Sequence, residues 1–279
     1  MNIKVLMITY NRPEYTKKSL TKLCDTAPEN VSITIWDNAS DSETKEVVSA
    51  FETHPRVEKV IFNDANEKLR KPTNWFWDHN RDADLLGKVD DDCLVADNWC
   101  QVLETAHKAI PSAGVLGSWR FFEEDVQYDL AKKKIVAFGN HQILRNCWVE
   151  GSGYLMKSEL IAKFGLLKEG QTFTDYCIRA AAKGYVNGWY YPFLYQEHMD
   201  DPRSEHTIFI NEEAFQKQKP LGAINFGVKT REDWIQRQVN NAKKIQQYSF
   251  NPYDFIGVKA WFKRKILKMT GNVYFPKVR

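Results

Sequence analysis

The first half of the chain alternates short apolar runs with amphipathic helical patterns, and this alternation constrains the fold more than any other feature. Each apolar run resembles a strand buried in a sheet, and the four runs cover 3–9, 31–36, 57–62 and 85–89. A helical pattern follows each run, and these patterns cover 13–24, 40–51, 72–79 and 98–110. Strands and helices that alternate at this spacing form an open α/β sheet with mostly parallel strands and helices on both faces.

The second half of the chain is less regular and divides into two parts. Residues 113–205 still contain strand and helix patterns, so we expect them to continue the sheet begun by residues 1–112. From residue 206 onward the sequence turns polar and helical. We therefore predict one large domain over 1–205 and a C-terminal helical extension over 206–279, which suits a chain of 279 residues.

The composition argues against several classes of protein. With 43% apolar and 27% charged residues the chain is ordinary for a globular protein, and its net charge of +3 does not indicate a nucleic-acid partner. Its five cysteines are odd in number and form no C-x-x-C pair, which argues against a disulfide framework and a zinc site. No apolar stretch has the length of a membrane span or the pattern of a signal peptide. We therefore expect a cytoplasmic protein that binds no nucleic acid.

Three consecutive acids follow the apolar run at 85–89, and they are the strongest chemical signal in the sequence. Asp90, Asp91 and Asp92 stand directly after a predicted buried strand. Ligands of open α/β sheets bind beyond the carboxyl ends of the strands, so a site is expected here. Because carboxylates packed this closely repel one another, Mg²⁺ or Mn²⁺ would relieve the repulsion, and a diphosphate would complete the coordination shell. An acidic surface turn is the alternative interpretation.

Two further polar clusters follow the first two predicted strands, at 9–13 and 36–40. An aspartate at such a strand end, here Asp37, can accept hydrogen bonds from a base or a ribose, and Tyr10 offers a face for stacking. Asn, Asp and Ser also favour turns and caps, so turn chemistry is the alternative for each cluster, and it is strongest for 38–40. Three polar clusters at three successive strand ends together indicate a ligand site.

These motifs, in this order, resemble the donor-binding half of family 2 glycosyltransferases with the GT-A fold. The order is TYNRP, WDNAS, an Asn-rich loop at 63–74, and VDDDC. Further along, VEGSGY at 149–154 resembles the glycine-containing acceptor loop of the family. The segment 173–185 resembles its E-D-x-x-x-x-R…G-Y motif, with Thr174 where the family usually has the first acid. The resemblance covers about residues 3–200. It implies an inverting, metal-dependent hexosyl transfer from a nucleotide sugar, with UDP favoured, to a hydroxyl group.

The resemblance also implies roles for individual residues, with a nucleotide-binding half over 1–112 and an acceptor half over 113–205. The donor nucleotide would contact Thr9, Tyr10, Asn11, Arg12, Asp37, Asn38, Asn66, Lys71, Asn74, Asp90 and Asp91. The Mn²⁺ or Mg²⁺ ion would bind Asp92, Asp90 and His198. The acceptor and the transferred sugar would lie against Trp148, Glu150, Gly151, Gly153, Tyr154 and Arg203. Asp175 would be the general base that removes the proton of the acceptor hydroxyl.

Alternatives remain open at this point. Asp175 is also the type of residue that the helix dipole favours at a helix N-terminus, and His198 and Arg203 are also ordinary loop residues. A nucleotidyltransferase would carry a G-x-G-x-R loop and a dehydrogenase a G-x-G-x-x-G loop after the first strand, where TYNRP stands instead. A non-catalytic nucleotide- or glycan-binding module with the same fold is the other rival. The joint presence of Asp90, Asp92, Asp175 and His198 argues against it.

The C-terminal segment predicts a basic amphipathic helix at 256–269. No acid follows Asp254, whereas seven basic residues do: Lys259, Lys263, Arg264, Lys265, Lys268, Lys277 and Arg279. Apolar residues recur at helical spacing: Val258, Trp261, Phe262, Ile266 and Met269. Such a helix suits an anionic membrane surface, and docking on the core of the protein itself is the alternative. A peripheral membrane position would suit a lipid-linked glycan acceptor and a role in surface polysaccharide synthesis.

Overall fold

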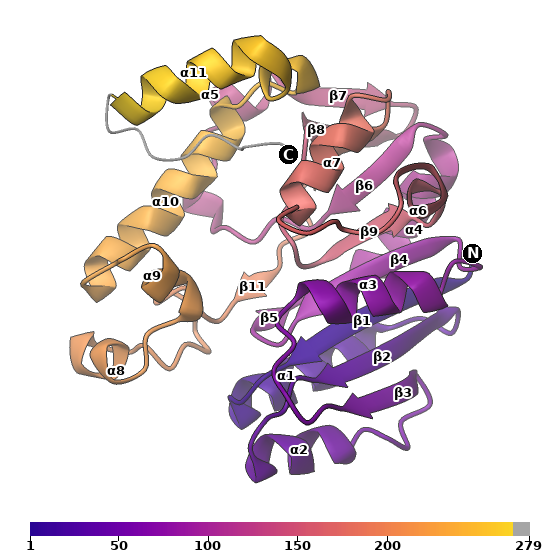
Figure 1. Ribbon diagram of the computed structural model, residues 1–279, viewed down its shortest axis with the longest axis vertical. Coiled ribbons are helices and arrows are strands. Elements are labelled where there is room, and N and C mark those ends of the chain that lie inside the picture. The colour runs from indigo at the N-terminus through magenta and orange to yellow at the C-terminus, as the bar shows by residue number, and fades with distance from the viewer. Residues whose placement is uncertain (270–279) are drawn as a thin grey trace.

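The computed structural model describes residues 1–269, and its centre is a mixed nine-stranded sheet flanked by helices (Figure 1). The strands of this sheet are β1 (Ile3–Thr9), β2 (Val31–Asp37), β3 (Val57–Phe62), β4 (Leu85–Asp90), β6 (Ala113–Gly117), β7 (Ile135–Phe138), β8 (His141–Asn146), β9 (Tyr154–Lys157) and β10 (Val186–Tyr191). A separate two-stranded ribbon consists of β5 (Cys93–Leu94) and β11 (Glu197–His198).

The helices divide into those that cover the sheet and those that follow it. The first group is α1 (Pro13–Thr26), α2 (Ser42–Ser49), α3 (Arg70–His79), α4 (Trp99–Ala109), α5 (Tyr128–Ala131), α6 (Glu159–Phe164) and α7 (Phe173–Ala181). The second group is α8 (Glu212–Lys217), α9 (Leu221–Asn225), α10 (Arg231–Gln247) and α11 (Gly257–Met269). Within residues 1–269, none of these helices has both the length and the apolar character needed to cross a bilayer.

The strand order is β3-β2-β1-β4-β9-β6-β10-β8-β7, and the first four strands run parallel. Strand β9 runs antiparallel between β4 and β6, and the hairpin of β7 and β8 closes the far edge beside β10. The predicted α/β fold with a mostly parallel central sheet is therefore confirmed.

One helix start differs from the expectation. Helix α2 begins after Asp41, whose Oδ1 accepts from the backbone N–H of Thr44 at 2.9 Å, whereas Ser40 Oγ accepts from the backbone N–H of Asn11 at 2.9 Å. The helical pattern predicted to begin at residue 40 therefore begins two residues too early. Asp41 caps this helix, because the Ser40 hydroxyl bonds to the turn after β1 instead.

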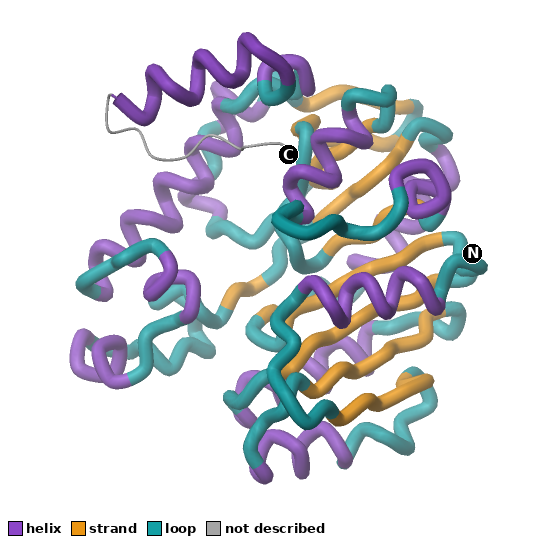
Figure 2. The backbone as a smooth tube through the Cα atoms, viewed as in Figure 1, coloured by secondary structure: helices purple, strands orange, loops and turns teal. Residues whose placement is uncertain are grey.

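Apolar side chains fill both faces of the sheet, and Figure 2 shows the helices on either side of the strands. On one face β1, β2 and β4 pack against α1, α2 and α4 through one hydrophobic cluster. On the other face a second cluster joins the sheet to α3, α6 and α7. Burial on both faces explains the near-continuous apolar runs of the parallel strands.

The C-terminal extension packs on the main domain rather than hanging free. Ala242 and Ile245 of α10 belong to the same core cluster as the sheet residues Trp189 and Leu144. Lys134, which is buried, donates from Nζ to the carbonyl oxygen of Ile245 at 2.7 Å. A small separate cluster of Phe209, Phe215, Ala223 and Trp234 joins α8, α9 and the start of α10.

Candidate active site

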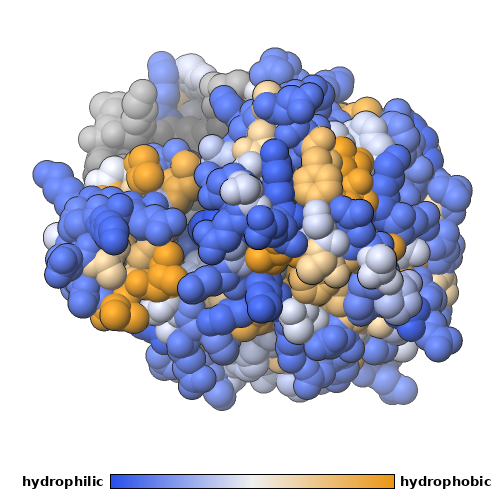
Figure 3. Space-filling view, turned by 90° about the horizontal axis from the view of Figure 1, so that it is seen from below, coloured by the Kyte–Doolittle hydropathy of each residue, from blue (hydrophilic) through white to orange (hydrophobic). Residues whose placement is uncertain are grey.

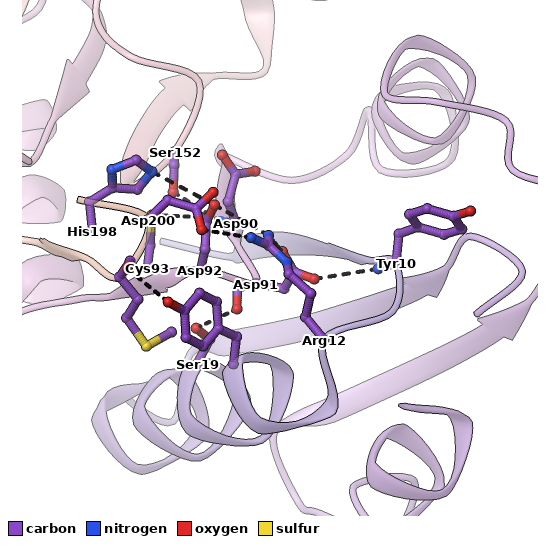
Figure 4. A network of polar contacts seen from close by, with 12 residues as sticks. Tyr10, Arg12, Ser19, Asp90, Asp91, Asp92, Cys93, Ser152, His198 and Asp200 are labelled. Carbon is purple, nitrogen blue, oxygen red and sulfur yellow. Dashed lines mark hydrogen bonds and ion pairs between the residues drawn. The ribbon is translucent and has the colours of Figure 1, made fainter. Parts of the chain in front are cut away.

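The carboxyl ends of β1, β2 and β4 meet at one edge of the sheet because the three strands are parallel neighbours. Thr9 at the end of β1 pairs with Asp37 of β2, and Ile8 pairs with Asp90 of β4. The three polar clusters of the sequence therefore lie together, as expected. Figure 4 shows the network of polar contacts that forms where the segments after β1 and β4 meet the loop after β11.

Arg12 stands at the centre of this network. It is the N-cap residue of α1, in the left-handed conformation with φ 64°, directly before Pro13. Its Nη2 donates to Asp91 Oδ1 at 2.9 Å and to Asp92 Oδ2 at 3.3 Å, and its Nη1 donates to Asp200 Oδ1 at 2.9 Å. Burial lowers the pKa of Arg12, but the three carboxylates outweigh burial and raise that pKa above its usual value. The guanidinium is thus the internal counter-charge of the acidic cluster.

Asp92 and His198 form a pair that fits a divalent cation. His198 faces the acids because it pairs with Cys93 in the β5–β11 ribbon, and its Nε2 lies 3.7 Å from Asp92 Oδ2. Two ligand atoms in an octahedral shell with bonds near 2.1 Å stand about 3.0 Å apart in cis and about 4.2 Å apart in trans. The separation of 3.7 Å lies between these two values, so the two atoms would approach by about 0.7 Å to take cis positions on one ion. The carboxylate oxygen suits Mn²⁺ and Mg²⁺, and the imidazole nitrogen favours Mn²⁺ of the two.

The immediate surroundings keep Asp92 ionised. Burial raises the pKa of Asp92, but attraction by His198 and Arg12 lowers it well below its usual value. The ligand atoms of Asp92, Cys93 and His198 all lie within 4.8 Å of one another. Burial raises the pKa of Cys93 well above its usual value, so this residue is a thiol and a poor ligand for a hard cation.

The glycine-containing loop between β8 and β9 is tied to the end of β4. Lys88 Nζ contacts the carboxylate of Asp90 and donates to the carbonyl oxygen of Gly151 at 3.1 Å. The backbone N–H of Asp90 donates to Ser152 Oγ at 2.9 Å, and the backbone N–H of Gly153 donates to the carbonyl oxygen of Lys88 at 2.8 Å. Asp90 is not among the residues whose ligand atoms converge, so its role as a metal ligand stays a prediction.

Arg120 connects this loop to His198, and the sequence analysis missed it. Its Nη1 lies 3.1 Å from His198 Nδ1, its Nε lies 4.0 Å from Glu150 Oε1, and its Nη2 donates to Gln238 Oε1 at 3.5 Å. Gln238 belongs to α10 and is fully buried, so the C-terminal extension contributes to the site. No local motif marks Arg120 or Gln238, because their partners lie far away along the chain.

The residues predicted to bind the nucleotide differ in their exposure and in the hydrogen bonds that they already form within the protein. Tyr10 is 47% exposed and offers its ring at the end of the network away from His198 (Figure 4). Asp37 is fully buried, and it accepts from Thr9 Oγ1 at 3.1 Å and from the backbone N–H of Ser40 at 3.0 Å. Asn38 accepts from the backbone N–H of Glu67 at 2.9 Å and so braces the loop after β3.

Other predicted donor contacts also have partners within the protein. Asn11 Oδ1 accepts from the backbone N–H of Asp41 at 3.0 Å, and Asn66 Oδ1 accepts from the backbone N–H of Lys68 at 2.9 Å. Lys71 forms an exposed ion pair with Glu67 at 2.6 Å. Asn74 binds the backbone of Leu167 with both ends of its amide, at 2.9 Å each. These contacts brace loops, and the donor contacts of these residues stay predictions.

Two aromatic residues expected to face a sugar lie in the core instead. Trp148 is 5% exposed and packs edge-to-face on Phe255, and Tyr154 is 1% exposed and stacks on Phe173 at 4.4 Å. A fully buried ring has no free face for a ligand, so neither ring can stack on a sugar as the structure stands. The local sequence does not distinguish an aromatic ring that faces a ligand from one buried in the core. For Trp148 the reason is that the C-terminal segment that covers it lies far along the chain.

Asp175 and Arg203 make contacts that stabilise the fold. Asp175 is 2% exposed and forms a capping box at the start of α7, where Oδ2 accepts from the backbone N–H of Thr172 at 3.0 Å. Arg203 binds both carboxylate oxygens of Asp125, at 3.0 and 2.8 Å, and also Asp201 at 2.7 Å. The roles of Asp175 as base and of Arg203 in the acceptor site remain predictions.

A cavity of about 1030 Å³ reaches this site from the side of α1. Arg120 and His198 form part of its wall, and aromatic side chains and the outer face of α1 form other parts: Phe121, Phe122, Tyr195, Lys17 and Lys18. The cavity therefore offers room for a ligand directly beside His198.

Comparison with known proteins places this site in a family. A family model described as glycosyl transferase family 2 matches residues 4–169, which include β1 to β4 and the three polar clusters. The chain belongs to glycosyl transferase family 2. The resemblance stated from the sequence motifs is thereby confirmed, and the protein is a glycosyltransferase. Among curated proteins, no sequence matches this glycosyltransferase significantly.

Solved structures agree with this fold at low sequence identity. A mannosyltransferase from Pyrobaculum calidifontis, in complex with GDP-Man and Mn²⁺, aligns with a TM-score of 0.58 at 16% identity, covering 97% of this chain and 79% of that one. S. aureus TarS 1–349 in complex with UDP-GlcNAc aligns with a TM-score of 0.51 at 15% identity, covering 87% of this chain and 79% of that one. At such identities the comparison supports the GT-A fold of this glycosyltransferase and no finer property.

Proposed function

We propose that this glycosyltransferase moves one sugar from a nucleotide-sugar donor to a hydroxyl group of a glycan acceptor, in a metal-dependent displacement that inverts the anomeric carbon. The Asp92–His198 pair is the observation that carries this proposal. A carboxylate and an imidazole stand 3.7 Å apart beyond the end of β4, where ligands of such sheets bind.

Asp92 and His198 would hold the Mn²⁺ or Mg²⁺ ion. When bound, the cation would stabilise the negative charge that grows on the departing diphosphate. The role of Arg12 is to keep Asp91 and Asp200 paired, so that the buried carboxylates are compensated while the donor enters and leaves. That the solved mannosyltransferase contains Mn²⁺ makes Mn²⁺ the first cation to test.

The donor would bind with its base at the Tyr10 end and its sugar at the His198 end. Tyr10 is the exposed aromatic ring of the cluster after β1 and can stack on a nucleobase. Of the solved structures, one contains GDP-Man and another UDP-GlcNAc, so both UDP and GDP donors belong in the first tests. UDP remains the favoured nucleotide from the family resemblance.

The acceptor would be a glycan, free or linked to a lipid. The cavity beside His198 provides room for it, and Phe121, Phe122 and Tyr195 supply aromatic surface of the kind that packs on sugar rings. Charged residues of the lining, including Lys17 and Glu123, can form hydrogen bonds with sugar hydroxyls. The acceptor would thus reach the anomeric carbon from the side opposite to the nucleobase.

Helix α11 would hold the enzyme at a membrane surface, where a lipid-linked acceptor would be found. Trp261 and Phe262 of α11 are 46% and 55% exposed. Leu221 and Ile224 of α9 are also exposed, at 71% and 59%. Figure 3 views the end of the molecule opposite to α11, and there too apolar patches interrupt a mostly hydrophilic surface. Sedimentation with vesicles containing anionic lipid should remove the protein from solution, and equal recovery with neutral and anionic vesicles would contradict this part of the proposal.

Calorimetry with UDP and GDP tests the proposed function directly. Each nucleotide is titrated into the protein with Mn²⁺ and again with a chelator, and we expect one of them to bind only with the metal. Asp92→Ala should abolish that metal-dependent binding, whereas Asp97→Ala, which removes an exposed acid of the same segment, should leave it unchanged. Nucleotide affinity in Asp92→Ala equal to that of the wild type would remove Asp92 from the metal site and refute the proposal.

A further inference from the structure

Aromatic side chains continue outward from the cavity beside His198 and form a surface patch of their own. The ring of Phe193 contacts those of Tyr191 and Tyr195, with centroids 5.3 and 6.1 Å apart. Tyr195 is 39% exposed and also lines the cavity, and Tyr128, the first residue of α5, is 49% exposed. We call these four residues the tyrosine patch: Tyr128, Tyr191, Phe193 and Tyr195.

The carboxylate of Glu123 lies among the phenol groups of this patch. The hydroxyl of Tyr128 donates to Glu123 Oε1 at 3.5 Å. Burial raises the pKa of Tyr195, and the negative charge of Glu123 and the nearby phenols of Tyr128 and Tyr191 raise it further. The Tyr195 hydroxyl therefore stays protonated and can donate a hydrogen bond as well as accept one. Glu123 lines the cavity too, so this carboxylate belongs to both surfaces.

The segments that carry the patch are held in place by other parts of the protein. The main chain on either side of Tyr195 pairs with that of Trp119 through two hydrogen bonds of 2.8 Å. The 3-10 helix η1 (Glu123–Asp125) is held through Asp125, whose carboxylate accepts from both terminal nitrogens of Arg203 at 3.0 and 2.8 Å. The patch is therefore preorganised, and a ligand would order little of the chain on binding.

A sugar is the class of ligand that fits this combination of groups. Its ring carries C–H groups that pack on aromatic faces and hydroxyl groups that bond to phenols and carboxylates. The negative charge of Glu123 acts on the neighbouring phenols, and Glu123 has no ion pair within residues 1–269. That charge would repel a phosphate, a uronic acid or an anionic lipid surface. The groups present therefore favour an uncharged sugar.

We propose that the tyrosine patch and Glu123 bind an uncharged sugar unit of the acceptor glycan, remote from the hydroxyl that reacts, an inference that rests on the proposed function. Tyr195 and Glu123 line the cavity that His198 also lines, so one glycan chain can extend from the cavity to the patch. The extended segment from Tyr195 to His198 corresponds to roughly 10 Å between their Cα atoms. This distance exceeds the width of one sugar ring, so the acceptor is an oligosaccharide.

The experiment measures binding of the full chain to immobilised glycans, from single sugars to hexasaccharides, with neutral and acidic members. Mn²⁺ and UDP are present, and the series is repeated with GDP. We expect the wild type to bind neutral oligosaccharides but not the corresponding single sugars. Tyr128→Ala and Glu123→Ala should each weaken this binding about tenfold, because a ring contact or hydrogen bonds are lost. Tyr128→Phe keeps the ring and should lose only about threefold.

Tyr253→Ala is the matched control, since Tyr253 is 62% exposed but lies in η2 (Pro252–Asp254) of the C-terminal extension. It should bind glycans like the wild type, and melting temperatures show whether each variant is folded. Wild-type affinity in both Tyr128→Ala and Glu123→Ala would overturn the inference. So would equal affinity for single sugars and oligosaccharides, binding of acidic glycans alone, or no glycan binding by the wild type.

Other occupants of the patch give different results. A wild type that elutes from gel filtration as a dimer, and that Tyr128→Ala converts to a monomer, would assign the patch to a second copy of this chain and refute the glycan site. Failure of the wild type to bind UDP or GDP with Mn²⁺ would instead overturn the proposed function. Glycan binding that still depends on Tyr128 in that case would support the patch as a glycan-binding surface without sugar transfer.

Discussion

Replacing Arg12 by glutamine removes the one cation within residues 1–269 that contacts all three of Asp91, Asp92 and Asp200. The three contacts measure 2.9, 3.3 and 2.9 Å, and Asp91 and Asp200 are each 6% exposed. Breaking a buried ion pair by deleting one partner costs about 3–5 kcal/mol, because a buried charge is left uncompensated. For a chain of this length about 2 °C corresponds to 1 kcal/mol, so Arg12→Gln should melt about 6–10 °C below the wild type in the presence of a chelator.

Mn²⁺ should return part of this loss, because a divalent cation at Asp92 supplies positive charge to the same carboxylates. Differential scanning fluorimetry of both proteins, with chelator and with Mn²⁺, measures the difference in melting temperature between the wild type and Arg12→Gln under each condition. The gap should also widen from pH 5 to pH 8, since carboxylates without a counter-charge escape the penalty only by taking up protons at low pH. Arg70→Gln is the matched control, because Arg70 pairs at 2.7 Å with the exposed Glu169 and its loss should change melting by about 1 °C. Melting of Arg12→Gln within about 1 °C of the wild type, or a gap that Mn²⁺ leaves unchanged, would refute this reasoning.

Two further predictions concern the fold. Gly153→Ala should cost several degrees of melting temperature, because Gly153 has φ +65° and its added Cβ would lie 1.8 Å from Gln196 Oε1, whereas Gly139→Ala, at φ +59° with nothing within 4 Å, should cost clearly less. Equal losses in the two variants would mean that the contact with Gln196 is unimportant. Burial lowers the pKa of Lys134 to about 7 from its usual 10.5. Between these two pH values the Lys134 amine is protonated in the unfolded chain and neutral in the folded protein. The free energy of unfolding from urea titrations should therefore rise between pH 7 and pH 9 by about 1.4 kcal/mol per pH unit, and the rise should vanish in Lys134→Met but persist in Lys133→Met. A slope that survives in Lys134→Met would show that another group causes it.

The sequence was sufficient to predict at which edge of the sheet the candidate site lies. Asp92 follows a strand whose apolar run requires burial on both faces, and that requirement alone sets the acids at its carboxyl end. His198 was predicted from the family resemblance, and the structure brings it to 3.7 Å from Asp92. Motifs at strand ends can be interpreted from the sequence, because parallel strands bring their carboxyl ends to the same edge of the sheet whatever the detailed packing of the side chains.

Side chains whose partners come from distant segments were not readable. Arg120 meets His198 after 78 residues and Gln238 after 118, and no spacing rule connects them. Asn74 has the composition of a ligand residue, but its amide serves the backbone of Leu167, 93 residues away. A polar side chain forms hydrogen bonds with whichever group tertiary packing brings near. Sequence alone therefore does not distinguish a residue that holds a loop in place from one that contacts a bound molecule.

The contact of α10 with the site has a consequence for synthesis of the chain. The indole Nε1 of Trp234 donates to the carbonyl oxygen of Asp200 at 2.8 Å, and Gln238 holds Arg120 against His198. Asp200 therefore leaves the ribosome 34 residues before the side chain that fixes its backbone. At about 5–20 residues per second this leaves roughly 2–7 s in which the sheet is complete but its acidic edge is unsupported. Nascent chains stalled before α10 are thus the ones in which chaperones would meet an unsupported acidic edge.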